Sequence, residues 1–262
     1  MTVEIENIRK DIRMHVETDT MMSNAWLLVY IAPIIAGILF LFSIFFYFAF
    51  TEVIIGPGPT PIGPSFSLLM FTILLPIIMI IAFIVSIILI YKLVQRRNTH
   101  FKRQIFLFDD IIAAVKAIAV KKGVNIDLEL ASCERTVREV RAEETEKSAA
   151  LWAILSAIIF IADWYVRYFL MGDFYKHERR EDGFWEDINK ALNKCNITFS
   201  IPRRLVTLPN RSFVLYLILT IITLGIFQIY WIYVLLKDPN DHFEYHNKIE
   251  NQFLSTLESV TI

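Results

Sequence analysis

Four long apolar segments constrain this 262-residue chain more than any other feature of its sequence. They cover residues 26–50, 68–91, 148–171 and 212–236, and the first two contain no charged side chain. Each has at least the roughly 20 residues that a helix needs to cross a bilayer core of about 30 Å. Hydrophobic residues make up 55% of the chain and the mean hydropathy is +0.49, which is too apolar for an ordinary soluble domain. The sequence therefore predicts an all-α integral membrane protein.

Basic residues predict the orientation of the first two segments. Residues 51–67 contain no Lys or Arg and are rich in Gly and Pro, whereas residues 92–147 contain twelve basic side chains. Because cytoplasmic loops retain Lys and Arg, we expect residues 26–91 to form a transmembrane hairpin whose loop at 51–67 is external. The chain is then a multi-pass protein of the cell membrane with a cytoplasmic N-terminus.

The third and fourth segments fit plain membrane spans less well. Residues 172–211 hold eight basic side chains, which a plain third span would place outside the cell. The sequence Thr-Leu-Gly at 223–225 lies at the centre of the fourth segment, where glycine permits a turn. Half-helices of about 12 residues are typical of re-entrant segments. We therefore expect segments 148–171 and 212–236 to be broken and re-entrant, with four plain spans as the alternative.

A Tyr-x-Leu-x6-His pattern occurs three times, each time at the C-terminal end of an apolar segment. The copies are Tyr91/Leu93/His100, Tyr168/Leu170/His177 and Tyr233/Leu235/His242. Aromatic rings with a polar tip settle at the depth of the lipid headgroups, so we interpret each Tyr as an interfacial anchor. After each His, apolar residues recur at helical spacing between charged flanks, which predicts an amphipathic helix. The sequence thus predicts three divergent Tyr–His units of similar orientation.

We expect a new helix to begin between the Tyr and the His of each unit. In the third unit Asp238 suits an N-cap and Pro239 suits the first helical position, so the membrane helix should stop near Lys237. Asp173 and Asn98 are the corresponding cap candidates in the second and first units.

The segments outside the bilayer are predicted to be cytoplasmic. They are an N-terminal amphipathic segment at 1–25, a helical hairpin at 92–147, an amphipathic helix and linker at 172–211, and a C-terminal amphipathic helix at 237–262. Ile5, Ile8 and Ile12 share one face of the N-terminal segment, which fits a short helix lying on the membrane surface.

Three histidines in three similar units raise the question of a shared site. His100, His177 and His242 could converge on a metal ion, since histidine is the commonest metal ligand. The alternative is that each His packs against a neighbouring helix or a lipid headgroup. Each lies on the stripe that buries its helix, and no carboxylate accompanies all three at a fixed offset. We favour packing, and we therefore predict no metal site and no cofactor.

Two other side-chain pairs are candidates for a functional role. Asp163 and Arg167 are four residues apart in the third segment, so they can pair on one helical face. Ionisable residues within membrane segments often mark a pathway, and a structural ion pair is the alternative. Cys133 and Cys195 lack CxxC spacing, which argues against a redox pair. With no GxSxG motif and no phosphate-binding glycine loop, no catalytic residue is assigned.

The C-terminal quarter resembles a known family. Residues 217–238 carry a Thr-Leu-Gly-Ile-aromatic core followed by an aromatic-Trp pair, at Thr223, Leu224, Gly225, Ile226, Phe227, Tyr230 and Trp231. This run is similar to a prokaryotic integral-membrane family catalogued as domain of unknown function 4234. Phe227 stands where tyrosine is usual, and the second and third apolar segments lack the core. The resemblance implies membrane class and prokaryotic origin, and it brings no activity, cofactor or catalytic residue.

Two function classes follow from these patterns. The favoured one is a non-enzymatic platform, in which amphipathic helices under the membrane organise the lipid bilayer, another protein or a second copy of the chain. The rival is a transporter or metal-dependent membrane protein that uses Asp163, Arg167 and the three repeated histidines. The formal charge of −1, without basic runs interleaved with aromatics, argues against a nucleic-acid partner.

Overall fold

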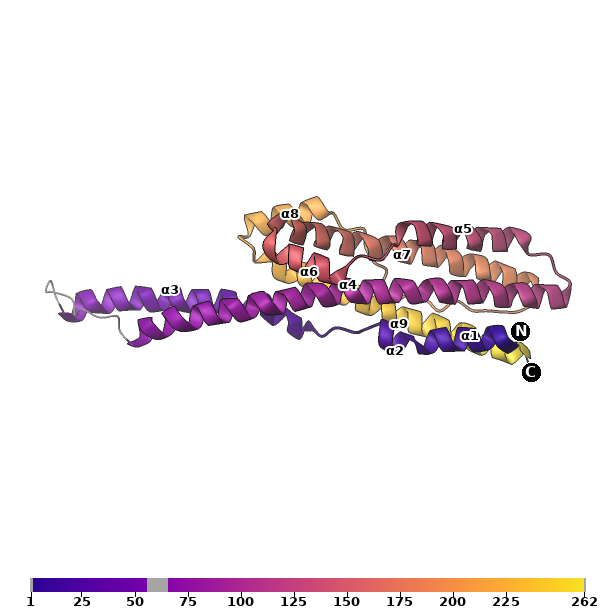
Figure 1. The fold of residues 1–262 in the computed structure, drawn as a ribbon, viewed down its shortest axis with the longest axis horizontal. Coiled ribbons are helices and arrows are strands. Elements are labelled where there is room, and N and C mark those ends of the chain that lie inside the picture. Colours follow the sequence, from indigo (N-terminus) through magenta and orange to yellow (C-terminus); the bar gives the residue numbers. More distant parts are fainter. Residues whose placement is uncertain (1, 56–65, 262) are drawn as a thin grey trace.

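The computed structural model describes residues 2–55 and 66–261, and within these ranges every regular element is helical. The elements are α1 (Thr2–Arg13), α2 (His15–Thr18), the 3-10 helix η1 (Asn24–Leu27), α3 (Leu28–Ile55), α4 (Phe66–Lys122), α5 (Asp127–Glu143), α6 (Ala149–Ile158), α7 (Phe160–Lys194), α8 (Phe213–Ile222) and α9 (Phe227–Thr261). The predicted all-α class is confirmed. The molecule is elongated, with both termini at one end (Figure 1).

The helices α3 and α4 lie side by side and project away from the other helices (Figure 1). Two stretches of the described chain, Asn24–Phe46 and Ile73–Lys122, form helices that are long and apolar enough to cross a membrane. Large apolar side chains such as Leu41, Phe45 and Ile80 are exposed along this pair, as the lipid-facing side of a membrane hairpin requires. The predicted external loop at 51–67 is shorter than expected, because α3 runs to Ile55 and α4 begins at Phe66. Its remaining part lies outside the described residues.

The third and fourth apolar segments are both broken, as predicted. The third breaks at Ile159, whose extended backbone separates α6 from α7. The fourth breaks after Thr223, where Leu224 and Gly225 adopt positive φ angles of 49° and 91°. Glycine reaches such angles without a steric penalty, which explains why the chain turns there.

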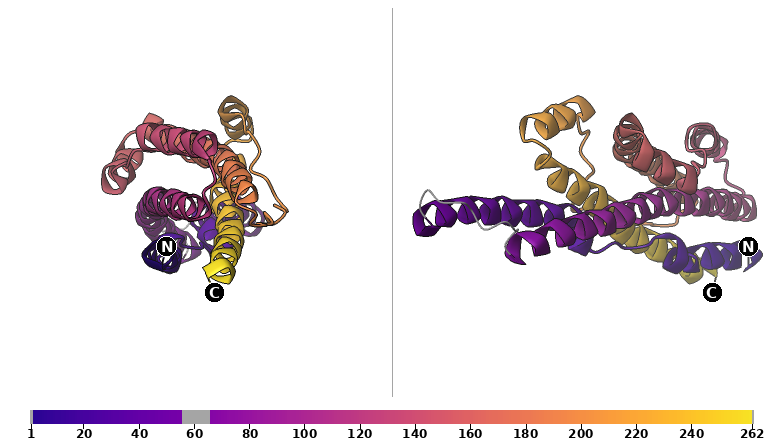
Figure 2. Two further views of the ribbon diagram at one scale, coloured as in Figure 1. Left: turned by 90° about the vertical axis from the view of Figure 1, so that its right-hand side faces the viewer. Right: turned by 60° about the vertical axis from the view of Figure 1, so that its left-hand side comes forward.

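The two broken segments have the same dimensions. In each, a helix of 10 residues precedes one of 35 residues. Both short helices begin with a serine cap: the Ser148 hydroxyl accepts from Leu151 N and the Ser212 hydroxyl accepts from Leu215 N. Ten residues rise about 15 Å, half of a bilayer core, so re-entry into the membrane stays our expectation for both segments. The helix α6 packs against α4, whereas α8 packs against α9 and stands apart from α4 (Figure 2).

The predicted helix starts within the Tyr–His units are wrong. The helices α4, α7 and α9 each run without interruption from an apolar segment into the polar end of the molecule. The three candidate caps bind distant partners instead: Asn98 Nδ2 donates to Lys147 O at 2.6 Å, Asp173 pairs with Arg97 at 2.8 Å, and Asp238 pairs with Arg211 at 3.0 Å. Tertiary contacts therefore override the local capping signal.

Pro239 lies inside α9 and does not end it. A proline has no N–H, so the carbonyl oxygen four residues earlier, on Leu235, loses its helical donor. Arg96 of α4 is 3% exposed, and its guanidinium donates to Leu235 O and, at 3.3 Å, to Leu236 O. The buried arginine thus replaces the missing backbone hydrogen bond and lets the helix continue.

The polar end of the molecule is a helical bundle with its own core. The core is built from α1, the second halves of α4, α7 and α9, and α5, which follows α4 through a turn at Gly123. Ile5, Ile8 and Ile12 of α1 are at most 6% exposed and pack into this core. The apolar face of α1 therefore contacts protein, and not the membrane surface that the sequence suggested.

Candidate metal centre

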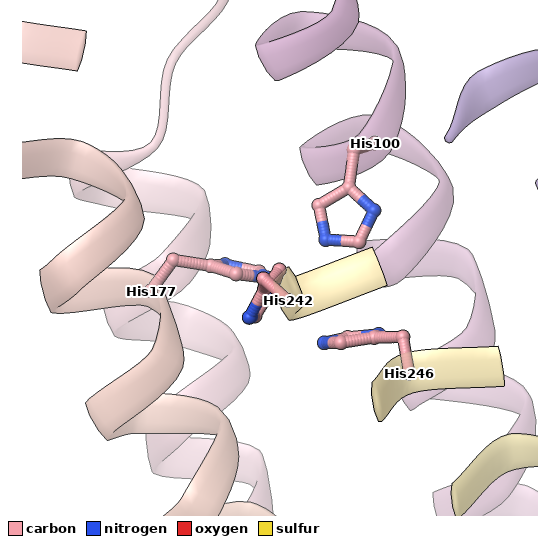
Figure 3. A group of neighbouring side chains, drawn as sticks. All are labelled: His100, His177, His242 and His246. Atoms are coloured by element: carbon pink, nitrogen blue, oxygen red, sulfur yellow. The ribbon is translucent and has the colours of Figure 1, made fainter. Parts of the chain in front are cut away.

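Four histidines meet at the centre of the bundle, near the place where it joins the apolar segments. His100 comes from α4, His177 from α7, and His242 and His246 from α9 (Figure 3). One ring nitrogen from each can be chosen so that all four lie within 4.8 Å of one another. All four residues are at most 1% exposed. We call these four residues the histidine cluster.

The cluster unites the three repeated histidines and adds one that sequence reasoning did not single out. His242 and His246 are four residues apart, so they lie on the same face of α9. This i, i+4 spacing in the sequence DHFEYH could have predicted that His246 lies beside His242. The fifth histidine, His15, lies elsewhere, and its Nδ1 contacts Ile12 O at 2.6 Å.

Each ring of the cluster is held by a carboxylate at Nδ1. The pairs are His100 with Asp19 at 2.9 Å, His177 with Glu144 at 2.7 Å, His242 with Glu178 at 3.4 Å, and His246 with Glu250 at 3.1 Å. A carboxylate can only accept, so an Nδ1–H donates to it, and the Nε2 atoms of His100, His177 and His242 keep their lone pairs. These three Nε2 atoms are buried and have no hydrogen-bond partner, whereas His246 Nε2 lies 2.5 Å from a carboxylate oxygen of Glu181. Carboxylate–histidine pairs of this kind orient the histidine ligands of metal ions.

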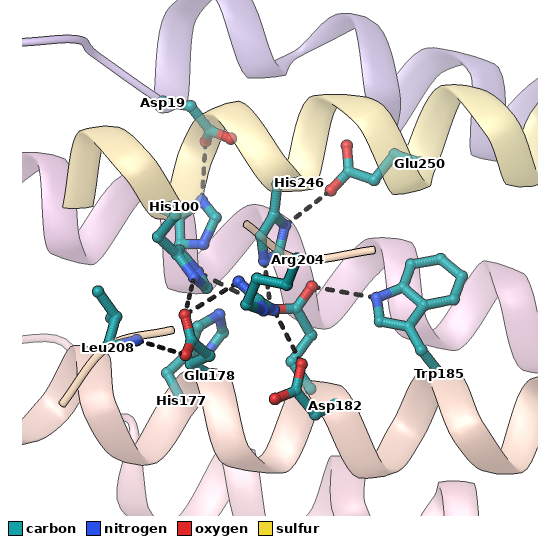
Figure 4. A network of polar contacts seen from close by, with 12 residues as sticks. Asp19, His100, His177, Glu178, Asp182, Trp185, Arg204, Leu208, His246 and Glu250 are labelled. Atoms are coloured by element: carbon teal, nitrogen blue, oxygen red, sulfur yellow. Dashed lines mark hydrogen bonds and ion pairs between the residues drawn. The ribbon is translucent and has the colours of Figure 1, made fainter. Parts of the chain in front are cut away.

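Glu181 of α7 supplies a fifth potential ligand, a carboxylate oxygen, beside the histidine nitrogens. Its Oε2 lies 2.5 Å from His246 Nε2 and 3.9 Å from His242 Nε2. Its Oε1 accepts a hydrogen bond from Trp185 Nε1 at 3.0 Å, which fixes the orientation of the carboxylate (Figure 4). The inner set of potential ligands is therefore four imidazoles and one carboxylate.

Three arginines hold the carboxylates in place. Arg103 bridges Asp19 and Glu250 at 2.8 and 2.9 Å. Arg204 contacts Glu178 at 2.9 Å (Figure 4), and Arg180 contacts Glu144 at 2.8 Å. All eight of these charged side chains are at most 15% exposed: Asp19, Glu144, Glu178, Glu181, Glu250, Arg103, Arg180 and Arg204. Five carboxylates against three guanidinium groups leave a charge of minus two when the four imidazoles are neutral.

The histidines of the cluster differ in their pKa values. Burial lowers the pKa of His100 to about 4, and burial also lowers the pKa of His242 well below its usual value. Burial alone would lower the pKa of His246 too, but Glu181 and Glu250 outweigh it and raise that pKa to about 9. Burial would raise the pKa of Glu181, whereas His246 and other nearby cations lower it to about 2. At neutral pH Glu181 is thus ionised, and His100 and His242 are neutral, as metal ligands must be, whereas His246 is protonated and must lose a proton to bind a metal ion.

A small group of buried apolar side chains, which we call the aromatic layer, packs against the histidine cluster. Phe101, Phe174, Phe243 and Leu208 form a small buried core, each at most 3% exposed. The Phe101 ring stacks on His177 with 4.3 Å between centroids, and the Phe243 ring lies 4.6 Å from His100. Two cavities reach neighbours of the cluster: one is lined by Phe174 and Leu208 and the other by Arg204, and neither is lined by one of the four histidines.

The other residues singled out from the sequence lie outside the cluster. Asp163 and Arg167 form the predicted pair, with Arg167 Nε 2.8 Å from Asp163 Oδ2. Tyr91 and Tyr168 are 43% and 52% exposed, and Tyr233 is partly buried. Their role as interfacial anchors stays a prediction.

Comparison with known proteins gives one match. Residues 211–260 match the family model described as domain of unknown function DUF4234, which confirms the resemblance seen in the C-terminal quarter. The matched region contains α8 and nearly all of α9, and so it carries His242, His246 and Glu250. No curated protein and no solved structure matches the chain.

Proposed function

We propose that this protein is a metal-binding membrane protein that holds one divalent transition-metal ion in its cytoplasmic bundle. The ligands are His100, His177, His242 and His246, with Glu181 as a fifth. The observation that carries the proposal is the arrangement of the rings: four Nδ1 atoms each face a carboxylate, the Nε2 atoms of His100, His177 and His242 have no partner, and one nitrogen of each of the four rings lies within 4.8 Å of the others. This is the alternative function class from the sequence, extended by His246 and Glu181.

Packing alone explains the cluster poorly. A buried polar atom without a partner costs about 1–3 kcal/mol, and the cluster has three such nitrogens in one place. The net negative charge of the surrounding groups adds a second cost in a buried environment. A divalent cation that displaces the proton of His246 removes both costs, because it binds the four rings and cancels the charge of minus two that remains.

The ligand set selects the kind of metal. Imidazole suits Zn, Cu, Fe and Ni, whereas Mg²⁺ and Ca²⁺ prefer oxygen ligands. Metal–nitrogen bonds of about 2.0–2.1 Å allow two ligand nitrogens to be at most about 4.2 Å apart. The widest separation in the cluster is 4.8 Å, so side-chain shifts of about half an ångström complete the coordination sphere.

The burial of the site favours a structural or electron-transfer metal over a catalytic one. Catalytic metals keep a coordination position open to substrate, and all four histidines here are at most 1% exposed. The ligands join α4, α7 and α9, which are the three helices that continue into apolar segments. We infer that the ion clamps these helices together at the cytoplasmic face of the cell membrane.

Metal analysis tests the proposal directly. The full chain, purified in detergent without chelator and through a tag that contains no histidine, should carry about one transition-metal ion per chain by mass spectrometry. His177→Ala and His246→Ala should each lose it, whereas His15→Ala, which changes a histidine outside the cluster, should keep it.

A second measurement protects against variants that misfold. The chelator-treated wild-type protein should take up one equivalent of Zn²⁺ or Co²⁺, and bound Co²⁺ should show the absorption bands of nitrogen ligation. A wild-type protein that is folded, contains no metal and takes up none of Zn²⁺, Co²⁺, Fe²⁺ or Cu²⁺ would refute the proposal.

A further inference from the structure

A second polar site lies among the apolar segments, away from the histidine cluster. A cavity of about 240 Å³ opens where α3, α4, α6, α7 and α9 meet. Its walls are apolar on Phe83, Ile87, Ile90, Ala153, Ala157 and Phe160. Six polar residues interrupt these walls: Tyr30, Ser86, Ser156, Asp163, Arg167 and Gln228. Polar side chains so concentrated within apolar segments point to a ligand.

Arg167 lines this cavity and has one nitrogen without a hydrogen-bond partner. The residue is 2% exposed, its Nε donates to Asp163, and its Nη2 donates to Tyr30 Oη at 3.0 Å. Its Nη1 is buried and has no partner. Because the Tyr30 oxygen accepts from Arg167, the Tyr30 proton is directed elsewhere and is a further donor. Arg167 and Tyr30 together suit an oxyanion.

The other side chains present acceptors. The Ser86 hydroxyl donates to Phe83 O and the Ser156 hydroxyl donates to Trp152 O, both at 2.7 Å. Each serine has thus used its proton within its own helix and offers lone pairs to the cavity. Asp163 is an acceptor as well, and its carboxylate is 19% exposed. Three acceptors without a proton suit a group that carries several N–H donors.

We propose that this cavity binds a small zwitterion that carries a primary ammonium group and an oxyanion. The oxyanion faces Arg167 and Tyr30, and the ammonium group faces Asp163, Ser86 and Ser156. The Asp163–Arg167 pair has no net charge, so an overall neutral ligand leaves no unbalanced charge among the apolar segments. Gln228 can donate or accept and fits either end.

Size limits the ligand to a small molecule or a headgroup. At about 30 Å³ per water, the cavity holds the equivalent of roughly eight waters, the size of phosphoethanolamine or a small amino acid. Two kinds of molecule carry a primary ammonium group and an oxyanion: a phosphatidylethanolamine headgroup that enters from the bilayer, and a free soluble zwitterion. The experiments below distinguish these two ligands.

The lipid source is tested in nanodiscs. The full-length protein is reconstituted in discs of phosphatidylcholine that contain 5% phosphatidylethanolamine or 5% phosphatidylglycerol, then extracted, and its retained lipids are counted by native mass spectrometry. Choline is the matched control, because its quaternary nitrogen has no N–H to donate. We expect retention of one phosphatidylethanolamine and at least a tenfold preference over phosphatidylcholine.

The soluble source is tested in pure phosphatidylcholine discs. The O-methyl esters of phosphoethanolamine and phosphocholine, which as phosphodiesters carry no net charge, are titrated by isothermal calorimetry, with glycine as a second small zwitterion. We expect the ethanolamine ester to bind at least tenfold more tightly than the choline ester if the ligand is free, and not to bind if it is the lipid.

Variants assign the binding to the cavity. Ser86→Ala combined with Ser156→Ala removes two acceptors and little volume, and it should lower the preference for the primary amine at least tenfold. Ile84→Ala, on an exposed face of the same helix, should leave the preference unchanged. Equal binding of the primary and quaternary amines in both settings would overturn the proposal, as would a preference that the double variant retains. Neither result depends on whether the histidine cluster binds metal.

Discussion

Asp19 and His100 are 81 residues apart in the chain, and Asp19 Oδ1 lies 2.9 Å from His100 Nδ1. Asp19 belongs to the arm that joins α1 to η1 (residues 14–23), and the same carboxylate accepts from Arg103 at 2.8 Å. Burial would raise the pKa of Asp19, but His100 and Arg103 hold that pKa well below its usual range. The arm therefore provides a permanently ionised partner for one ligand of the proposed metal.

The first prediction concerns this outer carboxylate. Asp19→Asn removes the negative charge that orients the His100 ring, and we expect the affinity for Zn²⁺ to fall about 10- to 100-fold. Competition with a chromophoric chelator measures the affinity. Asp127→Asn, at the exposed start of α5, is the matched control and should change nothing. An unchanged affinity in Asp19→Asn would show that the arm plays no part in binding.

The second prediction concerns stability. An ion that binds only the folded protein stabilises it by about 2.7 kcal/mol when its free concentration is 100 times the dissociation constant. Thermal unfolding in detergent should therefore shift upward with added Zn²⁺ for the wild-type protein and for His15→Ala. The shift should be absent in His242→Ala. A wild-type melting temperature that does not change with any transition metal would contradict our proposal that the ion holds α4, α7 and α9 together.

The third prediction concerns Pro239. Arg96→Met leaves the Leu235 carbonyl oxygen without its replacement donor, and we expect a loss of about 2–4 kcal/mol in the free energy of unfolding. Pro239→Ala restores the backbone N–H, so Arg96→Met should cost clearly less in that background. The four unfolding free energies of this double-mutant cycle measure the coupling. Equal costs in the two backgrounds would mean that Arg96 does not compensate for the proline.

The fourth prediction is a pH dependence outside the metal centre. Burial and the neighbouring carboxylate of Asp110 raise the pKa of Asp11 to about 6, against the opposing charges of Arg103 and Lys10. A raised carboxyl pKa means that the contribution to stability is complete below the unfolded value of about 3.9 and is lost as the pH rises through 6. Asp11→Asn should therefore flatten the stability profile between pH 4 and 7 and gain about 1–2 kcal/mol at pH 7.5. Chemical unfolding at several pH values measures it, and a loss of stability at pH 7.5 would contradict it.

The fifth prediction concerns the orientation in the membrane. Single cysteines at Pro61, Lys121 and Asn193, in a background without Cys133 and Cys195, are treated with an impermeant thiol reagent on intact cells. We expect labelling at position 61 alone. Labelling at position 121 but not 61 would reverse the hairpin, and labelling at 193 would mean that the third segment crosses the membrane.

The sequence predicted those parts of the fold that depend on local chemistry. The break in the fourth segment follows from Gly225, whose positive φ is a property of the residue itself. The break at Ile159 has no such signal, because neither it nor Phe160 disfavours a helix strongly. The caps at Asp238 and Asp173 failed because distant arginines bind those carboxylates, and no local pattern reports such partners.

The sequence predicted part of the candidate site, namely three of its four histidines. The common offset from Tyr brought out His100, His177 and His242, and the folded bundle brings these three residues together. No carboxylate lies at a fixed sequence offset from all three histidines. Asp19 and Glu144, which bind His100 and His177, come from connecting segments that have no counterpart in the other units. Only the folded bundle shows that each ring has a carboxylate.

The continuity of α4, α7 and α9 across the aromatic layer gives the cluster mechanical leverage. A 57-residue helix is a rod of about 85 Å, and a 35-residue helix is one of about 50 Å. A change in the tilt of the apolar half of a continuous rod moves the histidine on its other half. In the membrane placement that we propose, the spacing of the four nitrogens and the thickness of the surrounding bilayer are coupled, so each sets a preferred value for the other.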